Sequence, residues 1–401
     1  MTAANAAWDK LPPKLINSRS APSFPLFSRT NPLTLCLHQP GLLHFFSINW
    51  FCQVTNLAPT CEYGFVKLSE QAAIIGTTTW GTTLGILLAQ NNVPVAMLAR
   101  TESEAQTLSN ERRNTRFLPD AQFPDCFSVT SQPDSALAQS DLVVLAVPSD
   151  RLRENVRQIK PYLKSGAIIL SATKGLELPT ARRMSQVLED ELPASLKAEI
   201  CVLSGPNLAK EIVSRKPAST VIAGANSEAA QKAQSMLMST NFRVYTSSDV
   251  LGVELSGALK NIVALGAGIG DGMDAGENAK AAFITRGLAE MTRLGIAAGA
   301  DPLTFAGLAG LGDVVATCSS RLSRNRYVGE QLAKGRSWDE IKDSMDNVAE
   351  GVNATQAALV LAKELGVEMP IAEMASRVLF DGLSPQKAMA ELMSRPARSE
   401  W

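Results

Sequence analysis

Between residue 71 and about residue 250 the chain alternates between short apolar segments and amphipathic ones, and this alternation restricts the fold more than any other feature. Segments such as QAAIIG, SDLVVLAVPS and GAIILSATKG are almost continuously apolar. Helical patterns such as WGTTLGILLAQNN and RLRENVRQIKPYL stand between them. Apolar strands separated by helices indicate a parallel sheet that is covered on both faces. We therefore predict an α/β fold, with a Rossmann-like doubly wound parallel sheet over residues 71–250.

After residue 250 the pattern changes to helices alone. Stretches such as GVELSGALKNIVALGAGIGDG and NAKAAFITRGLAEMTRLGIAAG carry an apolar period of about 3.6 residues. We predict an all-helical C-terminal domain over residues 251–401 that holds substrate and catalytic groups. Residues 1–70 show no such period and contain few acids. We expect a disordered or wrongly assigned extension there, and an organelle transit peptide is the alternative.

Composition excludes several classes of protein. The net charge of −1 offers no basic surface for nucleic acid. No stretch approaches the roughly 20 apolar residues that we expect of a membrane span. The six cysteines are scattered without metal-ligand spacing, so we predict no metal site and a reduced compartment.

Histidine is nearly absent, and this restricts the chemistry. The two histidines, His38 and His44, both precede the first predicted strand. Acid–base catalysis in the rest of the chain must then use Lys, Asp, Glu, Tyr or Cys, and a Ser-His-Asp hydrolase is nearly excluded.

The segment GTTTWG follows the first predicted strand and resembles a dinucleotide-binding turn. Gly76 and Gly81 can fill the first and third glycine positions of that turn. Thr78 replaces the middle glycine and gives less clearance, although its hydroxyl could bind a phosphate. A cofactor site and a plain strand–turn–helix remain equally open from this segment. Arg100 ends the second strand, where a guanidinium suits the 2′-phosphate of NADP; the alternative is a solvated arginine.

Two lysines stand in positions suited to chemistry. Lys174 follows a buried strand in SATKG, and Lys260 lies in the otherwise small and apolar stretch SGALKNIVALG. Partial burial and a second nearby cation make a lysine ammonium a usable proton donor near neutrality. Most lysines on helices instead extend to water, which is the competing interpretation.

Two further segments suggest anion binding. LSGPNLAKE, residues 203–211, joins a strand end to a helix start and offers free backbone N–H groups. GLGDVVATCSSRLSRNRYVGE carries Asp313 and Thr317, and its two arginines Arg324 and Arg326 flank Asn325 at a helix start. That arrangement predicts a phosphate clamp. A solvated basic turn is an equally open interpretation.

These motifs, in this order, resemble the NAD(P)-dependent glycerol-3-phosphate dehydrogenase family. The resemblance covers residues 71 to about 395, and its most specific motifs are GALKN, TRGLAEM and SRNR. Supporting motifs are AVPS, ATKGLE, SGPNLAKE, GLGDVVATC and NVAEGVNA. The chain departs from the family pattern at Thr78, where glycine is usual, and at Asn207, where serine or threonine is more common.

The resemblance implies a role for each matching residue. Lys260 is similar to the general acid–base residue of the family, and Lys174 to the lysine that contacts both cofactor and substrate. Substrate positions are matched by Gly205, Asn207, Asp313, Ser323, Arg324 and Asn325. Cofactor positions are matched by Thr79, Trp80, Arg100, Ala209, Arg324, Val348 and Glu350, beside Gly76, Gly81 and Lys174.

The resemblance also implies a reaction. The family reduces dihydroxyacetone phosphate to sn-glycerol 3-phosphate, a precursor of phospholipids, with NADPH or NADH, and Arg100 favours NADPH. One alternative is another NADP-dependent hydroxy-acid dehydrogenase with the architecture of 6-phosphogluconate dehydrogenase. Another is a non-catalytic NADP-sensing protein. We expect a small-molecule substrate and a cytoplasmic location, or a plastid one if residues 1–70 are a transit peptide. A homodimer is left open.

Overall fold

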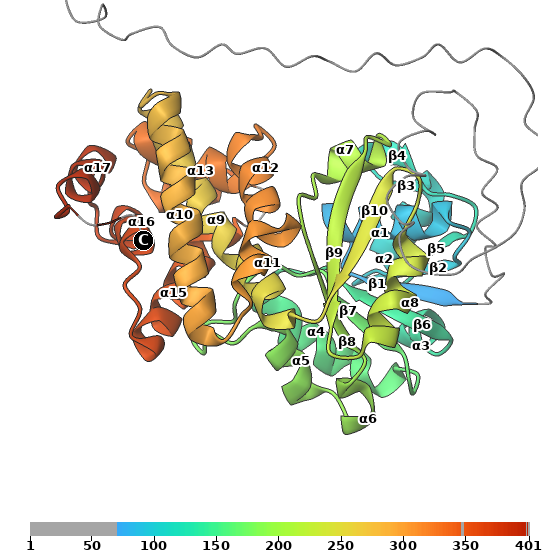
Figure 1. The fold of residues 1–401 in the computed structure, drawn as a ribbon. Coiled ribbons are helices and arrows are strands. Elements are labelled where there is room, and N and C mark those ends of the chain that lie inside the picture. Colours follow the sequence, from blue (N-terminus) through green and yellow to red (C-terminus); the bar gives the residue numbers. More distant parts are fainter. Residues whose placement is uncertain (1–69, 346–348, 398, 400–401) are drawn as a thin grey trace, which may run out of the picture. The chain divides into compact units, whose positions relative to one another are not determined.

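Figure 1 shows the fold in a computed structural model, which describes residues 70–345, 349–397 and 399. Residues Val66–Trp401 form one compact unit. The strands of this unit lie between Gln71 and Ser247, and only helices follow among the described residues. The predicted extension over residues 1–70 lies outside the described residues, apart from Glu70.

An eight-stranded sheet forms the first part of the unit. Its strand order is β10-β9-β8-β7-β6-β1-β2-β5, and all neighbours are parallel except β8 and β9. A separate antiparallel pair joins β3 to β4. The strands are β1 (Gln71–Ile75), β2 (Val95–Leu98), β3 (Arg113–Asn114), β4 (Leu118–Gln122), β5 (Phe127–Thr130), β6 (Ser140–Leu145), β7 (Ile168–Ser171), β8 (Ile200–Ser204), β9 (Ala218–Gly224) and β10 (Phe242–Ser247).

Helices cover both faces of this sheet because alternate strand residues point in opposite directions. Ala72 and Ile74 of β1 pack into one apolar cluster with side chains of α1, α2, α7 and α8. Ala73 and Ile75 pack into another with side chains of α3 to α6. The helices are α1 (Thr79–Gln90), α2 (Glu102–Glu111), α3 (Pro133–Leu137), α4 (Leu152–Ile159), α5 (Met184–Glu191), α6 (Ala194–Lys197), α7 (Ala209–Val213) and α8 (Ser227–Leu237), with short turns at Ser149–Arg151 and Lys160–Tyr162.

Helix α9 (Val250–Gly272) is the centre of the second part. Gly268 and Gly329 allow α9 and α13 to touch backbone to backbone, since a Cβ at either position would lie 2.0 Å from a carbonyl oxygen of the other helix. The surrounding elements are α10 (Glu277–Ala298), α11 (Pro302–Ala306), a π-helical turn (Leu308–Gly312), α12 (Asp313–Ser319), α13 (Arg324–Ala333), α14 (Trp338–Asp343), α15 (Glu350–Leu365), α16 (Pro370–Phe380) and α17 (Pro385–Met393). Figure 1 shows these helices beside the sheet, where α9 contacts β8 and β9.

The strand order predicts where a ligand binds to this sheet. The chain leaves β1 toward β2 on one side, and β6 lies on the other side of β1, so the order reverses between them. Ligands of such sheets bind outside the carboxyl ends of the strands at this reversal. The segments after β1, β6, β7 and β8 all lie at one edge of the sheet, because these four strands are parallel.

The predicted fold class is confirmed, with two corrections. Strand β9 runs antiparallel to β8, which the apolar pattern of ASTVIAGA does not reveal. Strands β5 and β10 and the β3–β4 pair were missed, because their half-exposed sequences lack a continuous apolar run. Among the described residues, α9 is long and apolar enough to cross a membrane by length and composition alone, but its most apolar stretch is 78% buried within the protein. The division at residue 250 stays a prediction.

Candidate active site

A single buried carboxylate holds the two predicted lysines. Asp313 Oδ2 accepts a hydrogen bond from Lys174 Nζ at 2.7 Å, and Oδ1 accepts one from Lys260 Nζ at 2.7 Å. The Thr317 hydroxyl accepts from Lys260 Nζ at 2.7 Å and donates to Asp313 Oδ1 at 3.1 Å. Lys174 also donates to the carbonyl oxygen of Gly205 at 3.0 Å. The structure thus brings together Lys174, Lys260 and Asp313, which lie far apart in the sequence.

The three charged members of this cluster come from different elements. Lys174 follows β7, where the Thr173 hydroxyl donates to the carbonyl oxygen of Val147 at 2.9 Å and fixes the loop. Lys260 lies in the middle of α9, and Asp313 begins α12. The side chain of Asp313 is 2% exposed and that of Lys260 is 10% exposed. The cluster therefore lies where the edge of the sheet meets the helices.

For both Lys174 and Asp313, burial and the opposite charge of the partner shift the pKa in opposite directions. Burial lowers the pKa of Lys174 to about 8; the Asp313 carboxylate counteracts this shift and the Lys260 charge adds to it. For Asp313, burial favours the neutral acid, but the charges of Lys174 and Lys260 outweigh it and hold the pKa of this carboxyl below its usual value. Asp313 is thus a carboxylate at neutral pH, and Lys174 is poised to lose its proton slightly above neutrality.

Arg324 lies at the start of α13, where desolvation by the surrounding protein lowers the pKa of its guanidinium and the Glu350 carboxylate counteracts that shift. Part of its side chain is nevertheless exposed, and Arg324 makes no hydrogen bond or ion pair with any described residue. Ser323 caps the same helix by accepting from the Arg326 backbone N–H at 3.3 Å. The first backbone N–H groups of this ten-residue helix and the Arg324 guanidinium together suit an anion.

The other two members of the predicted clamp are engaged inside the protein. Asn325 Nδ2 donates to Asn261 Oδ1 at 2.8 Å, and Asn325 Oδ1 accepts from the Gly351 backbone N–H at 2.9 Å. Arg326 Nε pairs with Asp271 Oδ2 at 2.6 Å, and its terminal nitrogen with Glu330 at 2.8 Å. The structure therefore does not support a second arginine in the clamp. Asn325 links α9, α13 and α15, and one hydrogen of its amide remains for a ligand.

The glycine turn after β1 has the shape that a dinucleotide requires. Gly76 has φ +113°, and a Cβ there would lie 2.6 Å from the Ala146 carbonyl oxygen. A Cβ at Gly81 would lie 2.2 Å from the carbonyl oxygen of Gly76. Thr79 and Trp80 form the first turn of α1, and Trp80 Nε1 is buried without a hydrogen-bond partner among the described residues. The turn and the free N–H groups of α1 fit a pyrophosphate.

Thr78 performs a structural task in this turn. Its hydroxyl donates to the Ala146 carbonyl oxygen at 2.8 Å and accepts from the Gly81 N–H at 3.1 Å. It therefore caps α1 and joins the loops after β1 and β6. The expectation that this hydroxyl binds a phosphate is not supported, because both of its roles are already occupied.

The remaining predicted positions lie around the same edge. Glu350 begins α15 and accepts from the backbone N–H and hydroxyl of Ser149, at 3.1 and 2.6 Å. Asn207 donates to the Ser219 carbonyl oxygen and accepts from the Thr220 hydroxyl, at 3.3 and 3.0 Å. Ala209 begins the short helix α7. Val348 lies outside the described residues.

Three residues that organise the site were missed by sequence reasoning. Asn114 Nδ2 donates to the Thr77 carbonyl oxygen at 3.0 Å and to the Thr82 hydroxyl at 2.9 Å, which braces the glycine turn. Asn261 follows Lys260 in α9, and its Oδ1 accepts a hydrogen bond from Asn325 Nδ2 at 2.8 Å. Glu104 approaches Thr77 from α2. A buried asparagine or a helical glutamate has no sequence signature, because its partners are distant in the chain.

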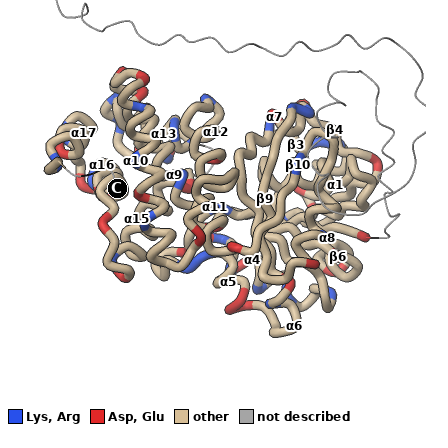
Figure 2. The backbone as a smooth tube through the Cα atoms, in the orientation of Figure 1, with Lys and Arg blue, Asp and Glu red and all other residues tan. Residues whose placement is uncertain are grey.

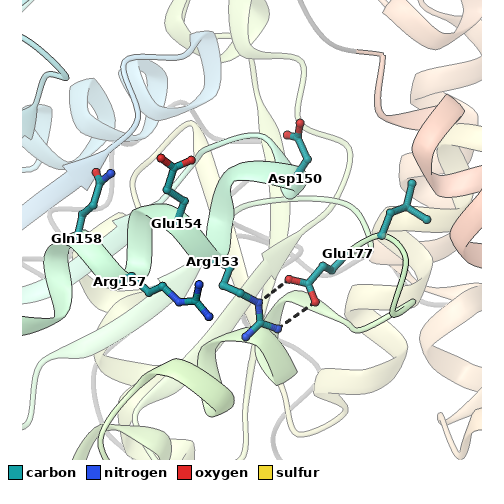
Figure 3. Close-up of a pocket in the computed structure, with 7 residues that line it drawn as sticks. Asp150, Arg153, Glu154, Arg157, Gln158 and Glu177 are labelled. Atoms are coloured by element: carbon teal, nitrogen blue, oxygen red, sulfur yellow. Dashed lines mark hydrogen bonds and ion pairs between the residues drawn. The ribbon is translucent and has the colours of Figure 1, made fainter.

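A separate hollow of about 440 Å³ lies along α4 (Figure 3). None of the predicted site residues line it. Arg153 there pairs with Glu177 at 2.7 Å, Asp190 at 3.1 Å and Glu191 at 2.8 Å. Because Arg153 is already paired with three acids, we interpret the residues around this hollow as an ion-pair network with a structural role. Figure 2 shows charged residues of both signs in this part of the chain, near α4, α5 and α6.

We predict that Asp313→Asn strongly destabilises the protein. The change leaves two buried ammonium groups without a counter-charge, and breaking a buried ion pair in this way costs about 3–5 kcal/mol. Urea unfolding of the purified variant measures this loss. Adding Lys174→Met should restore part of it, since one unpaired charge disappears. A single variant as stable as the wild type, or a double variant no more stable than the single one, would contradict the assigned cluster.

Comparison with known proteins places the chain in a family. Residues 71–230 match the model of the NAD-dependent glycerol-3-phosphate dehydrogenase N-terminus, and residues 249–390 match that of the C-terminus. A protein named glycerol-3-phosphate dehydrogenase [NAD(P)+] from Dehalococcoides mccartyi is 51% identical over 332 residues, which cover 82% of this chain and 92% of the relative. One of the same name from Chlorobium limicola is 44% identical over 328 residues, or 82% of this chain and 98% of the relative.

A solved structure supports the same assignment. The crystal structure of glycerol-3-phosphate dehydrogenase from Coxiella burnetii is 35% identical, covers 81% of this chain and 99% of its own, and superimposes with a TM-score of 0.77. The expectations of an oxidoreductase and of an NAD(P) cofactor are confirmed by these relatives. The chain belongs to the NAD-dependent glycerol-3-phosphate dehydrogenase family.

Proposed function

We propose that this protein interconverts dihydroxyacetone phosphate and sn-glycerol 3-phosphate, with Lys260 as the general acid–base residue. The observation that carries this proposal is the buried Lys174–Asp313–Lys260 cluster at the sheet edge that also bears the glycine turn. A protein that only senses NADP has no need of two lysines buried on one carboxylate. A phosphate-free hydroxy acid would have no use for Arg324, which makes no hydrogen bond or ion pair with the described residues.

The residues at the glycine turn fit a nicotinamide dinucleotide. Gly76 and Gly81 leave the backbone space that a Cβ would fill, and the N-terminus of α1 offers free N–H groups. The described residues that would hold the cofactor are Thr79, Trp80, Arg100, Lys174, Ala209, Arg324 and Glu350. Val348 lies outside the described residues and stays a predicted contact. When bound, the reduced nicotinamide supplies the hydride for ketone reduction.

Lys260 donates and accepts the proton in the proposed reaction. In reduction, Lys260 Nζ gives a proton to the former keto oxygen; in oxidation, it accepts the hydroxyl proton of glycerol 3-phosphate. Thr317 and Asp313 orient this amine, because both accept hydrogen bonds from it. The positive charge of Lys174 offsets the negative charge that develops on the substrate oxygen. Asp313 holds both amines in place through one hydrogen bond to each.

The substrate phosphate binds at the start of α13. Arg324 supplies the charge, and Ser323, Asn325 and the first N–H groups of the helix surround the anion. Gly205 and Asn207 close the site from the end of β8. Holding the phosphate in this way fixes the ketone for reaction, which turns a bimolecular encounter into an oriented one.

The product gives the protein a place in metabolism. Glycerol 3-phosphate is the backbone precursor of membrane phospholipids, so we assign the protein to their synthesis. Arg100 favours NADPH as the working cofactor. The three described cysteines, Cys126, Cys201 and Cys318, are free thiols, which suits a reducing compartment such as the cytoplasm.

The proton donor is tested by Lys260→Met. Loss of general acid–base catalysis should lower kcat for dihydroxyacetone phosphate by roughly 10²–10⁴, while the Kd for NADPH changes little. Steady-state kinetics and a fluorescence titration measure the two quantities. Lys280→Met is a matched control, because Lys280 is a similarly buried lysine that pairs with Asp271 outside the cluster. A near-normal kcat in the Lys260 variant would refute the assignment.

The phosphate site is tested by Arg324→Ala. A charge-assisted contact with phosphate is worth about 1.5–3 kcal/mol, so kcat/KM for dihydroxyacetone phosphate should fall by about 10- to 150-fold. Stability should be unchanged, since Arg324 makes no hydrogen bond or ion pair with the described residues. Free dihydroxyacetone is the control substrate, because it has no phosphate to lose. Equal losses with both substrates would remove Arg324 from the phosphate site.

A further inference from the structure

A carboxylate from α2 reaches the glycine turn. Glu104 Oε1 accepts from the Thr77 hydroxyl at 2.7 Å, and Oε2 accepts from the Arg100 backbone N–H at 3.0 Å. Thr77 follows β1 within the turn, and Arg100 follows β2, so this one carboxylate spans the ends of two neighbouring strands. The side chain of Glu104 is 29% exposed and thus remains open to a ligand.

The local sequence fixes this carboxylate in place. Thr101 caps α2 by accepting from the Glu104 backbone N–H at 3.2 Å, which sets Glu104 in the first turn of the helix. A negative charge is favoured there by the helix dipole. The carboxylate offers about four lone-pair positions, and the two contacts above occupy two of them. Glu104 therefore retains acceptor capacity for a ligand.

We propose that Glu104 determines the choice between NADH and NADPH. In sheets of this kind, an acid near the end of the second strand accepts a hydrogen bond from the adenosine ribose 2′-hydroxyl of NAD. The strand end here carries Arg100 instead, and the acid comes from the following helix. Glu104 accepts from the 2′-hydroxyl of NADH, and its charge repels the 2′-phosphate of NADPH. This inference rests on the proposed function.

Arg100 and Glu104 then act in opposite directions. Arg100 Nε lies 4.0 Å from Glu104 Oε2, and the arginine side chain is 80% exposed and free to turn toward a phosphate. With NADPH, the guanidinium neutralises the phosphate while the carboxylate opposes it; with NADH, the carboxylate provides the favourable contact. The pair explains how one site accepts both cofactors.

The test compares Glu104→Gln with the wild type. Glutamine keeps the shape and one acceptor but removes the charge. We expect kcat/KM for NADPH to rise and that for NADH to fall, so that their ratio changes about tenfold in favour of NADPH, the size of one lost hydrogen bond to a charged group. Glu102→Gln is the matched control, since Glu102 lies in the same helical turn but accepts from Ser131 and Gln106. Its ratio should stay unchanged.

Direct binding separates this inference from the proposed function. The Kd of each cofactor, measured by its fluorescence, should show the same change in ratio even if dihydroxyacetone phosphate is not reduced. An active enzyme in which Glu104→Gln leaves the ratio unchanged, or weakens both cofactors alike, would overturn the role of Glu104. The melting temperature of each variant confirms that the compared proteins are folded.

Discussion

The contact of Asp313 with both Lys174 and Lys260 is the interaction on which the site depends. Two amines of like charge repel each other, and burying either one alone is costly. The Asp313 carboxylate offsets this cost because each of its oxygens pairs with one lysine. The two lysines and one carboxylate together leave a net positive site for a phosphorylated, negatively charged substrate. The same contact joins the loop after β7 to α9 and α12. In the proposed mechanism, substrate chemistry and the attachment of the helices to the sheet edge therefore depend on the same ion-pair cluster.

The rest of the site follows from where that cluster lies. The reversal of strand order between β1 and β6 places the glycine turn at the same edge as Lys174. Glu350 fastens the start of α15 to Ser149 after β6, and Asn325 fastens α13 to α9 and α15. A cofactor at the turn and a phosphate at α13 would thus be held on either side of the lysines by elements that are themselves linked. Catalysis needs this fixed spacing, because small displacements cost large factors in rate.

The sequence predicted those parts of the molecule that local pattern determines. Continuous apolar runs predicted β1, β6, β7 and β8, and the absence of histidine after residue 44 favoured Lys174 and Lys260 as acid–base residues. Pattern did not reveal the direction of β9 or the partners of Asn325 and Arg326, because strand direction and side-chain pairing depend on residues far along the chain. The sequence pattern suggested that Thr78 weakens the glycine turn, whereas in the structure its hydroxyl caps α1. The substrate was identified only through resemblance to a family.

The central claim is that burial and Asp313 together set the pKa of Lys174. It is tested most directly by an NMR titration of protein labelled with ¹³C at lysine Cε, with Lys174→Met used to assign the signal. The account predicts one lysine with a pKa of about 8, well below the exposed lysines, whose signal disappears in Lys174→Met. In Asp313→Asn its pKa should fall further, because the stabilising negative charge is gone. A Lys174 that titrates with the exposed lysines, or one that ignores the loss of Asp313, would contradict the account.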